Sequence, residues 1–359
     1  MAVAWIGDRD VPVAQAAKHA AGLLVSSLSP VFSFDTDVHG TRAAIALAER
    51  VGAAYDHIGG EALARETALF TDKGGMFTAP GETRRRADVV VIAGSLPAHH
   101  HEFVAELAST APDLGGGASR QFFLIGAETK APYLSKVKPM RLAVAGAGID
   151  ATLAALRAQC AGRGVAKPVS NFERFAKALA EAKFPVFLFC GQSLDLPGLD
   201  MLQGLIADIN RKSRASALHL PASESGWGST LASTWMTGFP MRTGFARGMP
   251  EFDPWCFDVA RMIAAGEADL HVLISAKDRI VAAKGVSLIA LAKSKKPIAG
   301  AAVTISIGEP GIDHDAVAWS SRVGTLAAVK AQAATDLPDA ATVLRLIAEH
   351  LPDGKALPC

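Results

Sequence analysis

The chain has 359 residues, which is long enough for two or three domains that each bury a core. Half of its residues are hydrophobic and a fifth are charged, a composition that excludes general disorder. The formal net charge of +1 removes the long-range attraction on which nucleic-acid binding and docking to acidic membranes depend. We therefore expect no nucleic-acid partner and no membrane association.

The cysteines and the first residues point to a cytoplasmic protein. The four cysteines are far apart and form no CxxC pair, which suits a reducing compartment; they are Cys160, Cys190, Cys256 and Cys359. The first ten residues place acid where a signal peptide has a basic region, and no apolar run approaches the ~20 residues of a spanning helix. We expect a soluble, globular protein.

In the first half of the chain, short apolar runs alternate with longer helical patterns, as in parallel strands joined by crossover helices. Residues 88–93 (DVVVIA) form the clearest strand, because a short continuous apolar run is typical of a strand buried on both faces. The other expected elements are strands at 3–6, 31–34, 53–56, 121–126 and 140–144, and helices at 12–28, 41–51 and 61–70.

A second α/β stretch begins near residue 148. Its expected strands are at 185–190, 215–220, 270–275 and within 298–307, and its expected helices at 150–160, 201–211, 258–265 and 340–350. Residues 221–255, rich in Gly, Ser, Trp and Pro, break the pattern and are expected to be irregular. A long irregular run in a compact domain usually serves a site or an interface.

The residues reveal no catalytic apparatus. His99, His100 and His101 follow the strand at 88–93, but adjacent helical residues point in different directions, whereas metal ligands must converge. We expect these histidines to contact a partner or a polar ligand at a cleft edge. Gly191-Gln192-Ser193 lacks the second glycine of a nucleophile elbow, and no dinucleotide-binding glycine motif follows an early strand.

Several segments, in the same order over nearly the whole chain, resemble one family. They read RADVV at 86–90, GSLP at 94–97, IADINR at 206–211, TWMTGFP at 234–240, FARG at 245–248 and GID at 311–313. The family is the B subunit of formylmethanofuran dehydrogenase, a branch of the molybdopterin oxidoreductases. The resemblance implies two Rossmann-like α/β lobes with mainly parallel sheets, as in pterin-binding domains. We expect a discontinuous lobe of residues 1–148 and 250–359, with residues 149–249 inserted.

The departures from this family concern sulfur. Active members carry an iron-sulfur centre on an early cysteine cluster and hold molybdenum or tungsten through a cysteine or selenocysteine. Here no cysteine precedes Cys160, and the corresponding segment, residues 56–66, reads DHIGGEALARE. Soft metals and iron-sulfur clusters need thiolates. A carboxylate such as Glu61 could ligate molybdenum, but electrons would have no exit. We expect a redox-inactive relative with no cofactor and no metal.

The resemblance then implies a hydrolytic counterpart, the B subunits of formyltransferase/hydrolase complexes in methylotrophic one-carbon metabolism. Such complexes move a formyl group from tetrahydromethanopterin to a methanofuran-like carrier and hydrolyse it to formate, on other subunits. We expect a non-catalytic subunit of this hetero-oligomer, with the other subunits and the carrier as partners. Two alternatives remain open: an active molybdenum or tungsten dehydrogenase subunit, and a subunit that binds the carrier's acidic tail.

Two groups of site residues follow from this resemblance. Turn residues left from the old cofactor cleft are Gly94, Ser95, His101, Gly191 and Gln192, although these glycines could equally serve tight turns alone. Candidates for a subunit interface or for an acidic tail are Arg84, Arg85, Trp227, Trp235, Arg242, Arg247 and Lys295. The same residues could instead be core lining or solvated loops.

Overall fold

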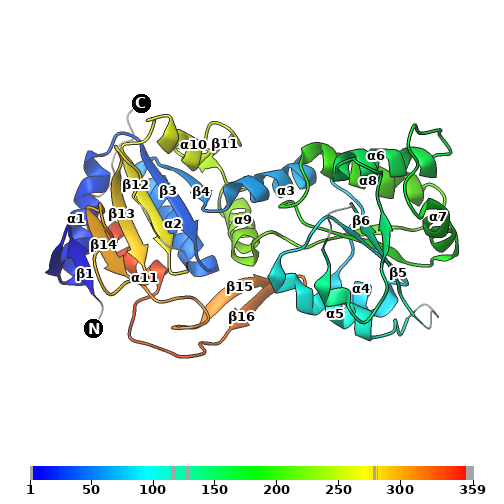
Figure 1. The fold of residues 1–359 in the computed structure, drawn as a ribbon. Helices are drawn as coiled ribbons and strands as arrows, with labels where there is room; N and C mark the ends of the chain where they lie inside the picture. The colour runs from blue at the N-terminus through cyan, green and yellow to red at the C-terminus, as the bar shows by residue number, and fades with distance from the viewer. Residues whose placement is uncertain (1–2, 115–118, 127–129, 278–279, 281, 353–359) are drawn as a thin grey trace. The chain divides into compact units, whose positions relative to one another are not determined.

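The chain forms two compact units, which the computed structural model describes for residues 3–114, 119–126, 130–277, 280 and 282–352 (Figure 1). Unit 1 comprises Met1–Ala64, Ser223–Trp319 and Leu326–Cys359, and unit 2 comprises Arg65–Ala222 and Ser320–Thr325. The boundaries expected after residues 148 and 249 fall inside these units. The helix after residue 148 packs in the core of unit 2, and the strand after residue 249 pairs within the sheet of unit 1.

Unit 1 is built on a mixed sheet, whose described strands have the order β11-β10-β4-β3-β12-β13-β14-β1-β2. The five central strands are parallel, and each outer strand is antiparallel to the strand it pairs with. The strands are β1 (Ala4–Ile6), β2 (Arg9–Val11), β3 (Pro30–Asp35), β4 (Ala54–His57), β10 (Thr243–Gly244), β11 (Glu251–Phe252), β12 (Leu270–Ser275), β13 (Ser287–Ala292) and β14 (Val303–Ser306). Figure 1 shows blue β3 beside yellow β12, so early and late parts of the sequence share the centre of this sheet.

The helices of unit 1 cover both faces of its sheet. Alternate strand residues such as Phe32, Phe34 and Ile274 pack against one helix layer, where Ala20 and Ala44 let the helices approach closely. That layer contains α1 (Val13–Ser26), α2 (Val38–Val51) and α11 (Ala340–Glu349), and the opposite face carries α10 (Val259–Ala264). The remaining elements are α9 (Glu224–Thr237) and the paired strands β15 (Ala316–Ser320) and β16 (Thr325–Val329).

Unit 2 is a three-layer α/β unit with a parallel sheet in the order β7-β6-β5-β8-β9 among the described strands. The central strand is β5, whose five residues are all buried, as the apolar run at 88–93 predicted. The strands are β5 (Val89–Ala93), β6 (Gln121–Ile125), β7 (Met140–Leu142), β8 (Pro185–Phe189) and β9 (Ser216–His219).

Helices also cover both faces of this second sheet. One layer is α6 (Ile149–Cys160), α7 (Phe172–Glu181) and α8 (Leu196–Asn210), and the other contains α5 (His101–Ser109) with the short 3-10 turns η1 (Ala98–His100) and η2 (Pro132–Leu134). Two further helices are α3 (Gly60–Asp72), which spans the boundary between the units, and α4 (Pro80–Arg86). Among the residues that the structure describes, no helix is long and apolar enough to cross a membrane.

Helix α9 corrects the expectation that residues 221–255 are irregular. Its Gly, Ser and Thr residues favour turns where they are exposed to water, which is the reason for that expectation. Here the small side chains let α9 pack closely on its neighbours: Ser229 Oγ lies 2.8 Å from Thr41 Oγ1 of α2, and Gly228 faces Trp319. Close packing, rather than an apolar stripe, stabilises this helix.

Candidate functional site

Two of the turns that we expected to border a cleft lie side by side in unit 2. Gly94 and Ser95 follow β5, Gly191 and Gln192 follow β8, and these two strands are paired neighbours. The Ser193 hydroxyl donates a 2.9 Å hydrogen bond to the carbonyl of Ser95 and so joins the turns. The carboxyl ends of parallel strands are where open α/β sheets bind their ligands.

A carboxylate of the chain itself fills this edge of the sheet. Glu66 lies on α3, and none of its side chain is exposed. Its Oε1 atom accepts hydrogen bonds from the backbone N–H groups of Gly191 at 2.8 Å and Ala222 at 3.1 Å, and from the Cys190 thiol at 3.7 Å. A phosphate or carboxylate ligand at these strand ends would need the same N–H groups.

The second oxygen of Glu66 faces a histidine. His219 ends β9, its Nε2 atom lies 3.3 Å from Glu66 Oε2, and its ring packs against Phe70 and Phe189. A buried carboxylate is costly unless hydrogen bonds and a complementary group compensate for the lost water. The two backbone N–H groups on Glu66 Oε1 and the imidazole near Oε2 offset part of that cost.

The residues next to Glu66 are adapted to it. A Cβ atom at Gly191 would collide with the Glu66 side chain, so only glycine permits the short approach. Burial, together with the adjacent Glu66, raises the pKa of the Cys190 thiol. A thiol held protonated is a poor nucleophile and a poor metal ligand. This edge therefore offers neither an anion site nor a reactive sulfur.

The three adjacent histidines bond two different backbone carbonyls. His99 and His100 both approach the carbonyl of Pro221, at 3.4 and 2.8 Å, whereas His101 bonds the carbonyl of Leu96 at 3.0 Å. Burial lowers the pKa of His100 to about 4, so this ring is neutral at physiological pH. Within the described ranges no cluster of three or more His, Cys, Asp or Glu side chains could hold a metal ion.

In unit 1, two carboxylates pair with Arg242. Asp56 and Glu61 both belong to residues 56–66, the segment that the resemblance compares with the metal-binding segment of active members. Arg242 Nε lies 3.1 Å from Asp56 Oδ2, and its NH2 nitrogen lies 3.1 Å from Glu61 Oε2 and 3.0 Å from Asp258 Oδ2. Arg242 is buried, with a left-handed backbone φ of 65°. Burial raises the pKa of Asp56 to about 6, although the charge of Arg242 acts in the opposite direction.

A second polar group lies at the carboxyl ends of β3 and β4. Asp35 Oδ1 and His57 Nε2 are 3.8 Å apart and buried. Burial raises the pKa of Asp35, but the hydrogen bond and charge of His57 and the charge of Lys277 outweigh it and hold this pKa at about 2. His57 Nδ1 accepts the Gly59 N–H at 2.9 Å, and Ser225 hydrogen-bonds Asp35 rather than the imidazole. The imidazole is therefore not bonded to the serine, and the three groups lack the serine–histidine–carboxylate order of a catalytic triad.

Three of the predicted surface cations are paired within the chain. The ion pairs are Arg84–Glu106 at 2.9 Å, Arg85–Asp113 at 3.1 Å and Arg247–Glu251 at 3.1 Å. Lys295 is exposed in unit 1, Arg242 is buried in that unit, and Arg84 and Arg85 belong to unit 2. Their role at an interface or with an acidic tail stays a prediction.

The two predicted tryptophans differ in exposure. Trp227 is partly buried, whereas Trp235 is 60% exposed near the end of α9, close in sequence to the exposed side chains of Met236 and Phe239. Glu66, His219 and Asp35 were not among the predicted site residues. Nothing in their local sequence marks them, because their partners lie far along the chain.

Comparisons with known proteins agree with the resemblance seen in the sequence. No family model matches the chain. The B subunit of the formyltransferase/hydrolase complex (Fhc) of Methylorubrum extorquens is 33% identical, over 97% of this chain and 98% of the relative. The B subunit of the tungsten-containing formylmethanofuran dehydrogenase 2 of Methanococcus maripaludis is 23% identical, over 72% of this chain and 63% of the relative.

A solved structure supports the same assignment. A chain in the crystal structure of the formyltransferase/hydrolase complex (FhcABCD) from Methylorubrum extorquens, in complex with methylofuran, matches with a TM-score of 0.87 and 33% identity, covering 96% of this chain and 98% of that one. The fold and the strand-end residues thus define a two-unit α/β protein that is similar to the B subunit of formylmethanofuran dehydrogenase. More narrowly, the chain belongs to the family of the formyltransferase/hydrolase complex B subunit.

Removing the Glu66 carboxylate should destabilise the chain. In Glu66→Ala the buried N–H groups of Gly191 and Ala222 lose their acceptor, and the free energy of unfolding should fall by about 3 kcal/mol. Urea denaturation measures this loss, and added acetate should restore part of it by binding the vacated N–H groups. Glu173→Ala, an exposed control on α7, should change little. An unchanged midpoint for Glu66→Ala would contradict the role given to this carboxylate.

The raised pKa of Asp56 predicts a pH dependence of stability. The folded chain keeps a proton on Asp56 up to about pH 6, whereas the unfolded chain releases it near 3.8, so this stabilisation is complete below pH 3.8 and is lost as the pH rises through 6. Relative to the unmodified chain, Asp56→Asn should therefore be less stable at pH 4 than at pH 7, by on the order of 2 kcal/mol. The exposed control Asp336→Asn should show no such trend. A pH-independent difference for Asp56→Asn would refute the assignment.

Proposed function

We propose that the chain is the B subunit of a formyltransferase/hydrolase complex and performs no chemistry itself. Its partners would transfer a formyl group from tetrahydromethanopterin to a methanofuran-like carrier and hydrolyse it to formate, a part of formaldehyde oxidation in methylotrophic one-carbon metabolism. The likeness to the Methylorubrum extorquens B subunit over almost the whole chain supports this role. We place the protein in the cytoplasm.

The observation that carries the non-catalytic role is the position of Glu66. In a working α/β site the strand-end N–H groups are kept for the ligand. Here the backbone N–H groups of Gly191 and Ala222 donate hydrogen bonds to the Glu66 carboxylate of the same chain, so they are not available to a ligand. A ligand anion would have to displace a fully buried carboxylate and leave it without partners, which costs several kcal/mol.

The residues at the old metal position do not fit a molybdenum or tungsten pterin. Residues 56–66 contain no sulfur, and both Asp56 and Glu61 lie within 3.1 Å of Arg242. The stretch before Cys160 also contains no thiolate that could hold an iron-sulfur cluster. These features favour the non-catalytic subunit over the active dehydrogenase.

We further propose that both units are Rossmann-like lobes of the kind that bind pterin nucleotides in molybdopterin oxidoreductases. The parallel strands at the centre of each sheet, with helices on both faces, support this relationship. So does the 23% identity with the tungsten-containing dehydrogenase subunit of Methanococcus maripaludis. On this proposal the strand-end edges are the remnants of a cofactor cleft.

Binding of the carrier is a second candidate function. The solved relative was crystallised with methylofuran, which favours it. Two of the basic residues that we predicted for an acidic tail give little support to carrier binding. Arg84 and Arg85 already form ion pairs with Glu106 and Asp113. Contact with the carrier is therefore compatible with the structural role but needs other residues of this chain.

Elemental analysis separates the structural role from the dehydrogenase. The assembly purified from its natural source should contain far less than one atom of molybdenum, tungsten or iron-sulfur iron per copy of this chain. This follows because thiolate ligands are missing from the positions where the family holds these metals. The tungsten-containing dehydrogenase of Methanococcus maripaludis, purified and measured in parallel, is the positive control. One bound tungsten or molybdenum per chain, with formate-dependent dye reduction, would overturn the proposal.

The exposed aromatic surface at the end of α9 predicts a subunit contact. Aromatic side chains dominate interface energetics, so Trp235→Ser should reduce co-purification of the partner subunits at least tenfold without lowering the thermal stability of the chain. Leu28→Ser removes an even more exposed apolar side chain, 95% exposed, from the same unit and is the matched control. Equal recovery of partners with Trp235→Ser and with the unmodified chain would argue against this contact.

A further inference from the structure

A pocket of about 1070 Å³ lies between α6, α7 and α8, entirely within unit 2. It is hollow because the facing helix positions carry small side chains, which cannot fill the space between the helices. These are Ala154 and Ala158 of α6 and Ala176 and Ala180 of α7. A volume of this size is typical of sites for small organic ligands.

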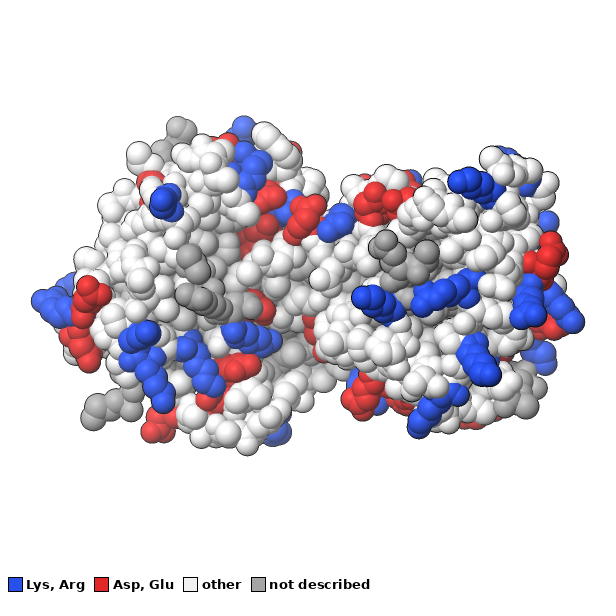
Figure 2. All heavy atoms as spheres, viewed as in Figure 1, with Lys and Arg blue, Asp and Glu red and all other residues white. Residues whose placement is uncertain are grey.

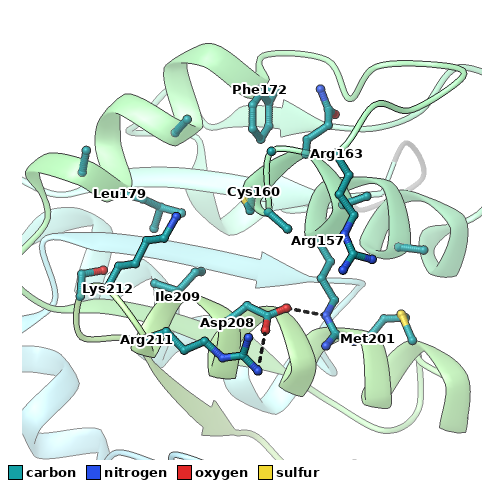
Figure 3. Close-up of a pocket in the computed structure, with 18 residues that line it drawn as sticks. Arg157, Cys160, Arg163, Phe172, Leu179, Met201, Asp208, Ile209, Arg211 and Lys212 are labelled. Carbon is teal, nitrogen blue, oxygen red and sulfur yellow. Dashed lines mark hydrogen bonds and ion pairs between the residues drawn. The ribbon is translucent and has the colours of Figure 1, made fainter.

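The pocket carries an excess of positive charge. Arg157, Arg163, Arg211 and Lys212 line it, and Asp208 is the only acidic side chain among its lining residues. Figure 3 shows Asp208 between Arg157 and Arg211, at 2.7 and 3.6 Å. The guanidinium of Arg163 and the ammonium of Lys212 have no carboxylate within ion-pairing distance among the described residues. Three positive charges thus remain unmatched in one pocket.

One of the arginines is held in place by the helix it faces. Arg157 Nε donates a 2.7 Å hydrogen bond to Asp208, and its guanidinium lies against α8 at Gly204, where any Cβ atom would collide with it. The hydrogen bond from Arg157, and then the charges of Arg157, Arg211 and Arg163, lower the pKa of Asp208 against the effect of burial. The cations are therefore close enough to act together on one anionic group.

The rest of the lining is apolar. Phe172 and Leu179 of α7 and Met201 and Ile209 of α8 face the same space, and the Cys160 thiol lies among them in Figure 3. Burial raises the pKa of Cys160 to about 11, so the thiol is neutral and adds to the apolar wall. A ligand that matches this pocket needs both a multiply charged anionic head and an apolar body.

We propose that this pocket binds a small organic phosphate, with the phosphate on Arg163, Lys212 and the Arg157–Asp208–Arg211 group and the apolar body against Phe172. A phosphate monoester carries nearly two negative charges at neutral pH, so it balances the net charge of +3 of the lining side chains better than a single carboxylate does. Arginine binds phosphate through paired N–H groups, and lysine acts as a point charge beside it.

The charge of the surrounding unit favours the same ligand. Unit 2 contains 20 Lys and Arg against 14 Asp and Glu, a net charge of +6, although the whole chain is nearly neutral. Figure 2 shows Lys and Arg side chains prevailing over Asp and Glu on the visible face of this unit. A field of this sign concentrates anions near the unit at low ionic strength. The inference is independent of the role in the complex, because none of the pocket residues takes part in the strand-end groups of Glu66 or Arg242.

The test is titration calorimetry of the full-length chain with 1-naphthyl phosphate, which joins a phosphate to an aromatic body. It should bind once per chain, at least tenfold more tightly than inorganic phosphate or neutral 1-naphthol. The affinity should fall as salt is raised. Arg163→Gln combined with Lys212→Gln should weaken it at least tenfold, because both free cations are lost.

Two further variants make the test specific. Arg174→Gln removes the same charge from an exposed position of α7 outside the pocket and should leave the affinity unchanged. Ala158→Phe fills the pocket without changing any charge and should abolish binding. The proposal fails if 1-naphthyl phosphate does not saturate below millimolar concentration. It also fails if inorganic phosphate binds as tightly, or if the doubly neutralised chain binds like the unmodified one.

Discussion

The carboxylate of Glu66 joins three parts of unit 2 that are far apart in the sequence. It accepts the N–H groups that follow β8 and β9, and it pairs with His219 at the end of β9. Since Glu66 and its bond to Gly191 are buried, the loss of this contact leaves polar groups without water, and this favours folding of the strand ends together with α3. The same contact explains the glycine at 191 and the protonated thiol of Cys190. Stability and the lack of a free anion site thus have one cause.

In unit 1, the buried side chain of Arg242 joins residues that are far apart in the sequence. Arg242 forms ion pairs with Asp56 and Glu61, which lie in the segment compared above with the metal-binding segment of active dehydrogenases, and with Asp258. Burial is the main cause of the raised pKa of Asp56 and outweighs the charge of Arg242, and the nearby charge of Asp258 raises this pKa further. At both strand-end edges, Glu66 and Arg242 thus find their ion-pair and hydrogen-bond partners inside their own unit.

The sequence predicted those parts of the structure that leave a local pattern of residues. It did not predict the parts that depend on contacts between residues far apart in the sequence. The apolar runs that became β5 and β8 were predictable because burial on both faces leaves a local pattern. Helix α9 was not, since its Gly and Ser residues favour turns unless a neighbour such as α2 packs against them. Gly191 was predicted as a site residue, but its partner Glu66 was not, because the contact between them is long-range. Arg242 was predicted as a residue of a subunit interface or a site for an acidic tail, and the local sequence does not show that three carboxylates surround it.

The two internal ions also bear on how an α/β protein can lose a cofactor and keep its fold. A tightly bound ligand stabilises the folded state and satisfies the strand-end polar groups, so its loss leaves those groups without partners. On the proposed function, a buried Glu66 and a buried Arg242 would replace both contributions from within the chain, and neither depends on ligand concentration. On the proposed function, the edges that once held a reactive group now contribute to folding alone. New binding must then use other surfaces, and the two that the structure offers are the exposed aromatic end of α9 and the basic pocket of unit 2.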